Sequence, residues 1–123
     1  MTQNFTLLDS CAWIAYLFNA PIITQIINSG QPLAMSVLSF YEIYRKLQKL
    51  HYSEEDISVL LELIKAKNAL TIPVDETIIR KAFSYTKKLA MADAIIYASA
   101  QQKGFPLLTR DNDFRGLPNV QFI

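Results

Sequence analysis

The stretch Leu89–Arg115 holds three carboxylates at a spacing that suggests a site for chemistry. Asp93 comes near the start of an expected helix, and Asp111 and Asp113 come just after a short apolar strand. In a parallel α/β fold, helix starts and strand ends open onto the same rim of the sheet, where such folds bind ligands. Packing of a hydrophobic core does not require three acids to meet there. We therefore take these acids as the candidate site.

Two further carboxylates extend this group. Asp9 follows the apolar run Phe5–Leu8, and Glu42 falls in the first turns of a later helix. Without matching cations such acids would repel and their pKa values would rise, unless a divalent cation neutralised them. Carboxylate oxygens suit Mg²⁺ or Mn²⁺, which keep several bound waters. A water of lowered pKa can attack a phosphodiester, and a second ion about 4 Å away can stabilise the leaving oxygen.

Each acid also has an ordinary structural explanation. Asp93 is a first-turn residue that the helix dipole favours, and Glu42 can pair with Lys46, four residues further on. The two acids after the late strand lie in a run where Asx turns are common. Asp9 is the hardest to explain in this way, because it ends an apolar strand and a buried unpaired carboxylate is costly. Singly the structural explanations are favoured, but together the five acids favour a metal site.

The elements that position these acids alternate between strands and helices. Apolar runs predict strands over Phe5–Leu8, Pro32–Val37, Leu70–Val74, Pro106–Thr109 and Val120–Ile123. Pro73 makes the third of these an edge strand or one that ends early. Helical apolar spacing fills the segments between them, which predicts a mostly parallel sheet covered by helices on both faces.

Six helices are expected from apolar spacing and from their start and stop signals. They are placed over Cys11–Phe18, around Ile22–Ile27, from Ser39 to about Leu50, from Ser53 to about Lys67, after Asp75, and over Met91–Lys103. Ser10, Ser53 and Asp75 are the candidate caps, Ser39 introduces its helix, and Gly104 ends the last helix.

Length and composition bound the class of protein. A chain of 123 residues that is 51% hydrophobic and 19% charged suits one folded domain over residues 1–123. The 12 Lys and Arg nearly balance the 11 Asp and Glu, so the net charge of +1 does not indicate a partner. The sequence has one cysteine, Cys11, and one histidine, His51, which excludes an internal disulfide and a zinc site of His and Cys ligands. Any metal must therefore be held by oxygen.

The first part of the chain also indicates how Cys11 is placed and where in the cell the protein is expected. We expect Cys11 to be buried as a small hydrophobe, because it lies in an apolar run. The first residues do not read as a secretory leader, and the apolar runs are too short to span a bilayer. We therefore expect a cytoplasmic protein without a membrane segment.

Four segments together resemble a PIN domain, and in spacing and size they are most similar to the VapC-type toxins of toxin-antitoxin pairs. They are Asp9-Ser10, Glu42 in the helix that opens with Ser39, MADAIIYASA around Asp93, and TRDNDF over Thr109–Phe114. The resemblance covers essentially the whole chain. It implies a three-layer α/β/α sandwich with a central, mostly parallel sheet, and a ribonuclease that depends on Mg²⁺ or Mn²⁺.

The resemblance also implies roles for particular residues. Asp9, Glu42 and Asp93 match the three best-defined acids of the family, and as the fourth acid Asp111 is the first choice and Asp113 the second. All five are candidate catalytic residues, and all except Asp113 are candidate metal ligands. Ser10 and Thr109 match polar supporting positions. Ala90 departs from relatives, which often have a helix-capping Ser or Thr there.

Partners follow from the resemblance and from the distribution of charge. The substrate is expected to be RNA, with a structured RNA such as a tRNA as one hypothesis, because specific recognition of RNA usually targets unpaired loops. Candidate contacts are Arg45, Lys46, Lys49, Arg110 and Arg115, with Tyr41 and Tyr44 as stacking surfaces. The alternative is that these lysines form a solvated helix face and these tyrosines belong to the core.

Relatives are commonly homodimers that a cognate antitoxin inhibits, which implies the same partners for this chain. The apolar helices around Ile22–Ile27 and Leu60–Ile64 are candidate contact surfaces, although such faces more often belong to the core.

Two alternative functions remain at this level. A non-catalytic RNA-binding or assembly module on the same fold would bind RNA without turnover. A phospho-signalling receiver domain would need adjacent acids after the first strand and a lysine after a late one. Here Ser10 follows Asp9 and Arg110 follows Thr109, which disfavours the receiver domain.

Overall fold

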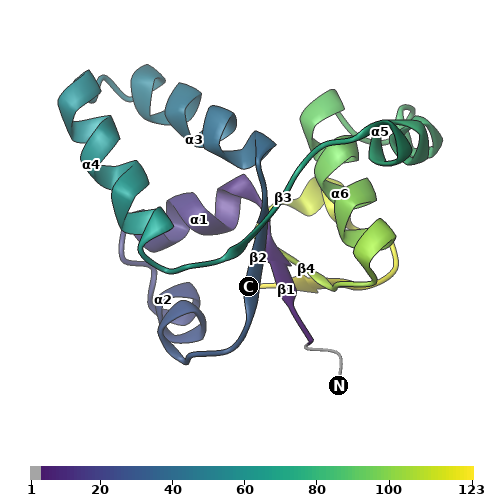
Figure 1. Cartoon of the computed structure of the whole chain (residues 1–123), viewed down its shortest axis with the longest axis horizontal. Coiled ribbons are helices and arrows are strands. Elements are labelled where there is room, and N and C mark those ends of the chain that lie inside the picture. Colours follow the sequence, from purple (N-terminus) through teal and green to yellow (C-terminus); the bar gives the residue numbers. More distant parts are fainter. Residues whose placement is uncertain (1–3) are drawn as a thin grey trace.

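The computed structural model describes residues 4–123, and its centre is a parallel β-sheet (Figure 1). The strands are β1 (Thr6–Leu8), β2 (Leu33–Ser36), β3 (Leu70–Ile72), β4 (Leu107–Thr109) and β5 (Val120–Phe122). They lie in the order β3-β2-β1-β4-β5, and every neighbouring pair is parallel. The predicted edge position of the third strand is confirmed.

Helices cover both faces of this sheet. They are α1 (Ser10–Leu17), α2 (Pro21–Asn28), α3 (Leu38–Lys49), α4 (Glu54–Lys65), α5 (Glu76–Ala82) and α6 (Met91–Lys103), with short 3₁₀ turns η1 (Phe83–Tyr85) and η2 (Asn112–Phe114). In Figure 1 the first four helices lie on one side of the sheet and α5 and α6 on the other. The three-layer α/β/α sandwich is therefore confirmed.

Two hydrophobic cores hold the three layers together. Because side chains alternate along a strand, Leu7 packs with Ile96 and Tyr97 of α6, while its neighbour Leu8 packs with Trp13 of α1 and Ile43 of α3. All six of these side chains are buried. Each central strand thus contributes to both cores, which fixes the face that every strand residue occupies.

Helix boundaries follow the sequence signals in most places. Ser53 and Asp75 accept hydrogen bonds from the backbone of the helices that they cap, as predicted. The helix Met91–Lys103 has the predicted bounds, and Gly104 ends it at a φ of 72°, a left-handed conformation that glycine adopts readily. Within the described chain no single helix could cross a membrane, and only α1 and α2 combined, bent by 100°, have the necessary length and composition.

Two helix starts differ from the prediction. Asp9, and not Ser10, caps α1, because its carboxylate accepts from the backbone N–H of Ala12. Ser10 is the first residue of the helix itself. Helix α3 begins at Leu38 without a side-chain cap, so Ser39 lies inside the helix, where it is fully buried.

The connections on either side of β1 determine where a ligand can bind. The chain passes from β1 to β2 on one side, whereas β4 pairs with β1 on the other, with Leu8 opposite Leu108. Such a reversal of strand order opens a crevice at the carboxyl ends of the two strands. Asp9 follows β1, and Thr109 is the last residue of β4. Both therefore lie at this crevice.

Candidate active site

Asp9 is the most buried acid of the site, with 2% of its surface exposed. Its Oδ1 accepts from the backbone N–H of Ala12 at 2.9 Å, and its Oδ2 accepts from the hydroxyl of Thr109. Burial raises the pKa of Asp9 to about 7, although both hydrogen bonds act to lower it. The negative charges of Asp93 and Asp111 contribute to this raised value. The fold therefore holds this carboxylate where ionisation is costly.

Thr109 links Asp9 to the acids that follow β4. Its Oγ1 accepts from the backbone N–H of Asp111 at 2.9 Å, while the same hydroxyl donates to Asp9. The carboxylate of Asp111 in turn accepts from the backbone N–H of Asp113 at 2.9 Å, which forms the Asx turn foreseen in the sequence. The Asx turn does not argue against a site here, because it positions Asp111 and Asp113 in the acidic cluster.

Asp93, Asp111 and Asp113 form the tightest part of the cluster. Each offers one carboxylate oxygen, and these three oxygens lie within 4.8 Å of one another. Burial, together with the charges of Asp111, Glu42 and Asp113, raises the pKa of Asp93 to about 6. A first-turn position on α6 would by itself lower this pKa, so burial and repulsion among the acids together outweigh the helix dipole.

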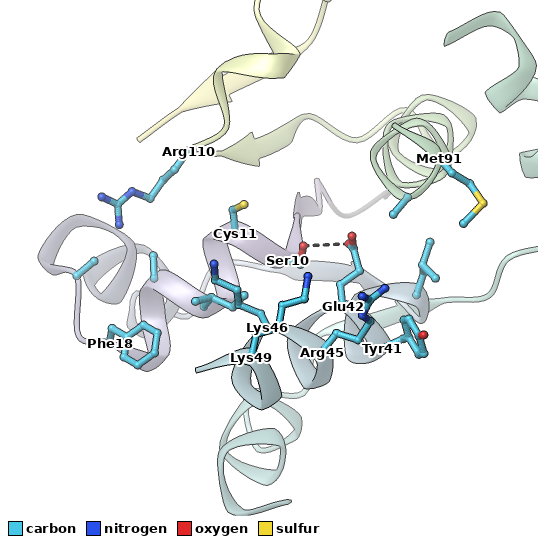
Figure 2. A pocket seen from close by; sticks show the side chains of 15 residues that line it. Ser10, Cys11, Phe18, Tyr41, Glu42, Arg45, Lys46, Lys49, Met91 and Arg110 are labelled. Carbon is cyan, nitrogen blue, oxygen red and sulfur yellow. Dashed lines mark hydrogen bonds between the residues drawn. The ribbon is translucent and has the colours of Figure 1, made fainter. Parts of the chain in front are cut away.

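Glu42 approaches the cluster from helix α3. Its Oε1 accepts from the hydroxyl of Ser10 at 3.0 Å, as Figure 2 shows. Burial raises the pKa of Glu42, and this hydrogen bond partly offsets the rise. Glu42 makes no ion pair with Lys46; the pair found within residues 4–123 is Arg80–Glu76. The helix-pair explanation of Glu42 is therefore wrong.

The donor set fits a hard divalent cation. It consists of carboxylate oxygens from Asp93 on α6 and from Asp111 and Asp113 after β4, with Asp9 and Glu42 close enough to contribute to the electrostatics of the group. Mg²⁺ and Mn²⁺ prefer oxygen ligands of this kind. Along the part of the chain that the structure describes, these acids have no lysine or arginine within ion-pair distance. A cation would relieve the repulsion that raises their pKa values.

The profile of the PIN domain matches residues 6–120 of this sequence. The chain belongs to the PIN-domain family. A search of curated proteins finds no match.

Three solved structures illustrate the similarity of this chain to proteins of the same fold. A chain of the toxin-antitoxin complex from Klebsiella pneumoniae is 24% identical, with 94% of this chain and 95% of that chain covered and a TM-score of 0.73. The sarcin-ricin-loop-cleaving toxin VapC20 of Mycobacterium tuberculosis is 15% identical, with 94% and 96% covered and a TM-score of 0.77. A chain of DNA-bound VapBC2 from Rickettsia felis is 14% identical, with 97% of each covered and a TM-score of 0.74.

A groove of about 710 Å³ is lined by Glu42 and by residues adjacent in sequence to the other acids, Ser10, Ala92 and Arg110 (Figure 2). Helices α1 and α3 form much of its wall, and the start of α6 and the segment after β4 complete it. Four of the predicted RNA-contact residues line it: Arg45, Lys46, Lys49 and Arg110. Tyr41 lines it as well, whereas Tyr44 does not and donates its hydroxyl to Glu54 at 2.9 Å.

Arg115 is not among the residues that line this groove. Its guanidinium lies over the ring of Phe122, 4.8 Å from the ring centroid, and its Nε donates to the side chain of Asn112 at 2.9 Å. The η2 turn thus directs Arg115 to the end of β5. Of the candidate RNA contacts after β4, the structure brings only Arg110 to the groove.

Cys11 is exposed and lines the groove, so the prediction of a buried thiol is wrong. Partial burial of the sulfur, followed by the charges of Asp9 and the other nearby acids, raises the pKa of the thiol to about 12. The thiolate is therefore scarce at neutral pH, and Cys11 is a poor nucleophile despite its exposure. Its placement and that of Phe18 on the groove were not foreseen from the sequence.

Proposed function

We propose that this PIN domain, extending over residues 1–123, is a metal-dependent endoribonuclease that hydrolyses phosphodiester bonds of RNA and is the toxin of a toxin-antitoxin pair. The observation that carries the proposal is the meeting of Asp93, Asp111 and Asp113, whose carboxylate oxygens lie within 4.8 Å of one another at the strand ends of a PIN fold. These three acids hold Mg²⁺ or Mn²⁺, together with Asp9 and Glu42.

The residues around the metal position are fixed by hydrogen bonds. Thr109 and the backbone of Ala12 hold Asp9, and Ser10 holds Glu42. Each carboxylate oxygen that accepts one hydrogen bond keeps a second lone pair for a cation. A bound divalent cation supplies a water of lowered pKa and stabilises the charge that develops on the leaving oxygen. The protein supplies the orientation, because all five acids are attached to helix starts and strand ends of one rigid sheet.

The groove supports RNA as the substrate. Arg45, Lys46 and Lys49 of α3 line the groove on the same helix as Glu42, and Arg110, from the segment after β4, lines its other end (Figure 2). Phosphates bound to these cations lie next to the metal position. The toxin VapC20, which has the same fold, cleaves the sarcin-ricin loop. An unpaired loop of a structured RNA, such as a tRNA, is the substrate proposed for this chain.

Two protein partners are part of the proposal. Several chains of this fold were solved as toxin-antitoxin complexes, which supports a cognate antitoxin that occupies the groove. Exposed apolar side chains on α2 and α4 offer contact surfaces for the antitoxin or for a second copy in a homodimer; they are Ile22, Val59 and Leu63. The cytoplasm, where RNA is accessible, is the proposed location.

The experiment that tests this function is cleavage of a total RNA preparation by the purified protein, with Mn²⁺ or Mg²⁺ and with chelator. Asp93→Asn, purified in the same way, is the matched variant. We expect discrete fragments that require metal and are absent with the variant, and sequencing of the new ends would identify the target. If both proteins bind RNA and neither cleaves it, a non-catalytic RNA-binding module replaces the nuclease.

A further inference from the structure

Two aromatic rings, Phe18 and Tyr52, are exposed together at one end of the groove. Phe18 follows α1, and Tyr52 lies between α3 and α4, so the two come from distant parts of the chain. Their ring centroids are 6.4 Å apart, and 46% of Phe18 and 37% of Tyr52 is exposed. Phe18 lines the groove itself. The two rings are tilted by 39° to each other, and together they form an apolar surface that the core does not use.

Hydrogen bonds fix the backbone that carries both rings. The N–H of Phe18 donates to Ile14 at 3.1 Å, and that of Tyr52 donates to Leu47 at 3.2 Å. Ile14 and Leu47 belong to α1 and α3, whose inner faces pack in the same hydrophobic core. The exposure of the rings is therefore a consequence of well-anchored helix ends. A ligand that stacks on these rings has little ordering to impose on them.

The positively charged side chains near the rings indicate which kind of ligand would bind. In Figure 2 Phe18 and Arg110 lie at one end of the groove, Tyr41 at the other, and Lys46 and Lys49 between them. None of these cations makes an ion pair within residues 4–123. A polyanion that also carries flat, apolar faces matches this surface. Single-stranded RNA has both features, because its phosphates bind cations while its unpaired bases stack on aromatic side chains.

The volume of the groove also favours single-stranded RNA. Its volume of about 710 Å³ falls within the range of sites that bind small ligands, which is ~300–1,000 Å³. Such a space suits a few unpaired nucleotides. A duplex keeps its bases stacked on one another and could not offer one to Phe18.

We infer that Phe18, supported by Tyr52, is a base-stacking subsite that holds one unpaired base of the RNA strand at the end of the groove away from Tyr41. The assignment of the acids as the cleavage site rests on the proposed function, but the stacking contact is a property of binding alone. It gives the groove a fixed position for one nucleotide relative to the metal position. Stacking of this kind tolerates any base, since every base has an aromatic face.

The test compares two strands of equal charge. One is a fluorescein-labelled oligoadenylate dodecamer of RNA, and the other is the same ribose-phosphate strand without bases. Binding of each to the full-length protein is measured by fluorescence anisotropy at low salt and with chelator, so that cleavage does not enter the result. Phe18→Ala is compared with the wild type and with Phe83→Ala. Phe83→Ala is the matched control, because the ring of Phe83 is also exposed, on η1, and does not line the groove.

We expect Phe18→Ala to weaken binding of the oligoadenylate about tenfold and to change binding of the abasic strand less than about twofold, as loss of one stacked base predicts. Phe83→Ala should change neither, and Phe18→Trp should retain the wild-type preference for the strand with bases. If Phe18→Ala weakens both strands equally, or neither, the subsite is refuted. A surface for a protein partner would then explain the exposed rings. This result leaves the cleavage test of the proposed function standing, because that test depends on the acids and on metal.

Discussion

Thr109 and Asp9 share a buried hydrogen bond that joins the end of β4 to the end of β1, across 100 positions of sequence. The hydroxyl of Thr109 donates to Asp9 and also accepts from the backbone of Asp111. One side chain thus fixes both the deepest acid of the site and the turn that carries the next two. The geometry of the cluster depends on this contact.

Replacement of Thr109 by valine tests this dependence, because valine keeps the shape and removes both hydrogen bonds. The carboxylate of Asp9 then loses a donor that lowers its pKa, so we expect its pKa to rise above about 7. The acidic limb of the pH profile for metal-dependent RNA cleavage should move to higher pH. The free energy of unfolding, measured by urea denaturation, should fall by about 1–3 kcal/mol.

Thr71→Val is the matched control for this variant, since Thr71 is an exposed residue of the edge strand β3. It should leave both the pH profile and the rate of cleavage as in the wild type. A Thr109→Val protein with an unchanged pH profile would show that the hydroxyl does not act through Asp9.

Asp93→Asn should stabilise the metal-free protein. The pKa of Asp93 is raised from 3.8 to about 6, so its contribution to stability is fully present below pH 3.8 and is lost as the pH rises through about 6. A neutral asparagine avoids this loss. Because Asp93 is partly exposed, we expect the free energy of unfolding of Asp93→Asn to exceed that of the wild type by only ~1 kcal/mol at neutral pH, or roughly 3–5 °C in Tm. Near pH 4 we expect almost no difference.

Thermal unfolding in chelator at several pH values measures this difference. Glu62→Gln, an exposed change on α4 away from the site, serves as the control and should show no pH-dependent gain. Addition of Mn²⁺ should reverse the order of the Tm values, because the wild type gains more from the cation. An Asp93→Asn protein that is less stable than wild type in chelator would contradict the conclusion that the charge of Asp93 destabilises the metal-free protein.

Asp111 and Asp113 should differ in their importance. Asp111 is partly buried and accepts a hydrogen bond from the Asx turn, whereas Asp113 is exposed, and Asp111 has the larger effect on the pKa of Asp93. A charge in a less solvated position interacts more strongly with a cation. We expect Asp111→Asn to lower the rate of Mn²⁺-dependent cleavage about tenfold more than Asp113→Asn. Equal losses would contradict this ranking of the two acids, and a larger loss at Asp113 would make Asp113 the fourth acid.

Arg110 and Arg115 provide a matched pair for RNA binding. Arg110→Gln should weaken binding and lower the salt dependence by about one counterion, because its side chain lines the groove. Arg115→Gln should leave RNA affinity unchanged and cost at most ~1 kcal/mol of stability, since its cation-π contact with Phe122 is lost. Binding titrations at two salt concentrations separate these outcomes. Equal effects on RNA binding would argue against the groove as the RNA path.

Much of the architecture could be predicted from the sequence because each element has a strong local signal. The helix Met91–Lys103 is bounded by Gly104, and Ser53 and Asp75 mark helix starts with side chains that cap them. The position of acids at strand ends follows from the parallel sheet alone. The parallel sheet predicts that Asp9 and Asp111 share one rim, and in the structure the hydroxyl of Thr109 links them.

Other features depend on tertiary contacts that local signals do not carry. Asp9 and Ser10 are both good cap residues, and only the structure shows that the carboxylate of Asp9 accepts from the N–H of Ala12. Helix α1 is apolar all round, so its periodicity could not show that Cys11 and Phe18 face a groove. The position of α3 decides which side of α1 stays open.

The most direct test of the central claim is a calorimetric titration of Mn²⁺ into the metal-free wild type, Asp93→Asn and Glu62→Gln near neutral pH. We predict binding to the wild type with release of protons from the acids of raised pKa, an affinity at least about tenfold lower for Asp93→Asn, and no change for Glu62→Gln. Indistinguishable titrations of all three proteins, or no binding to the wild type, would contradict the assignment of these carboxylates as a metal site.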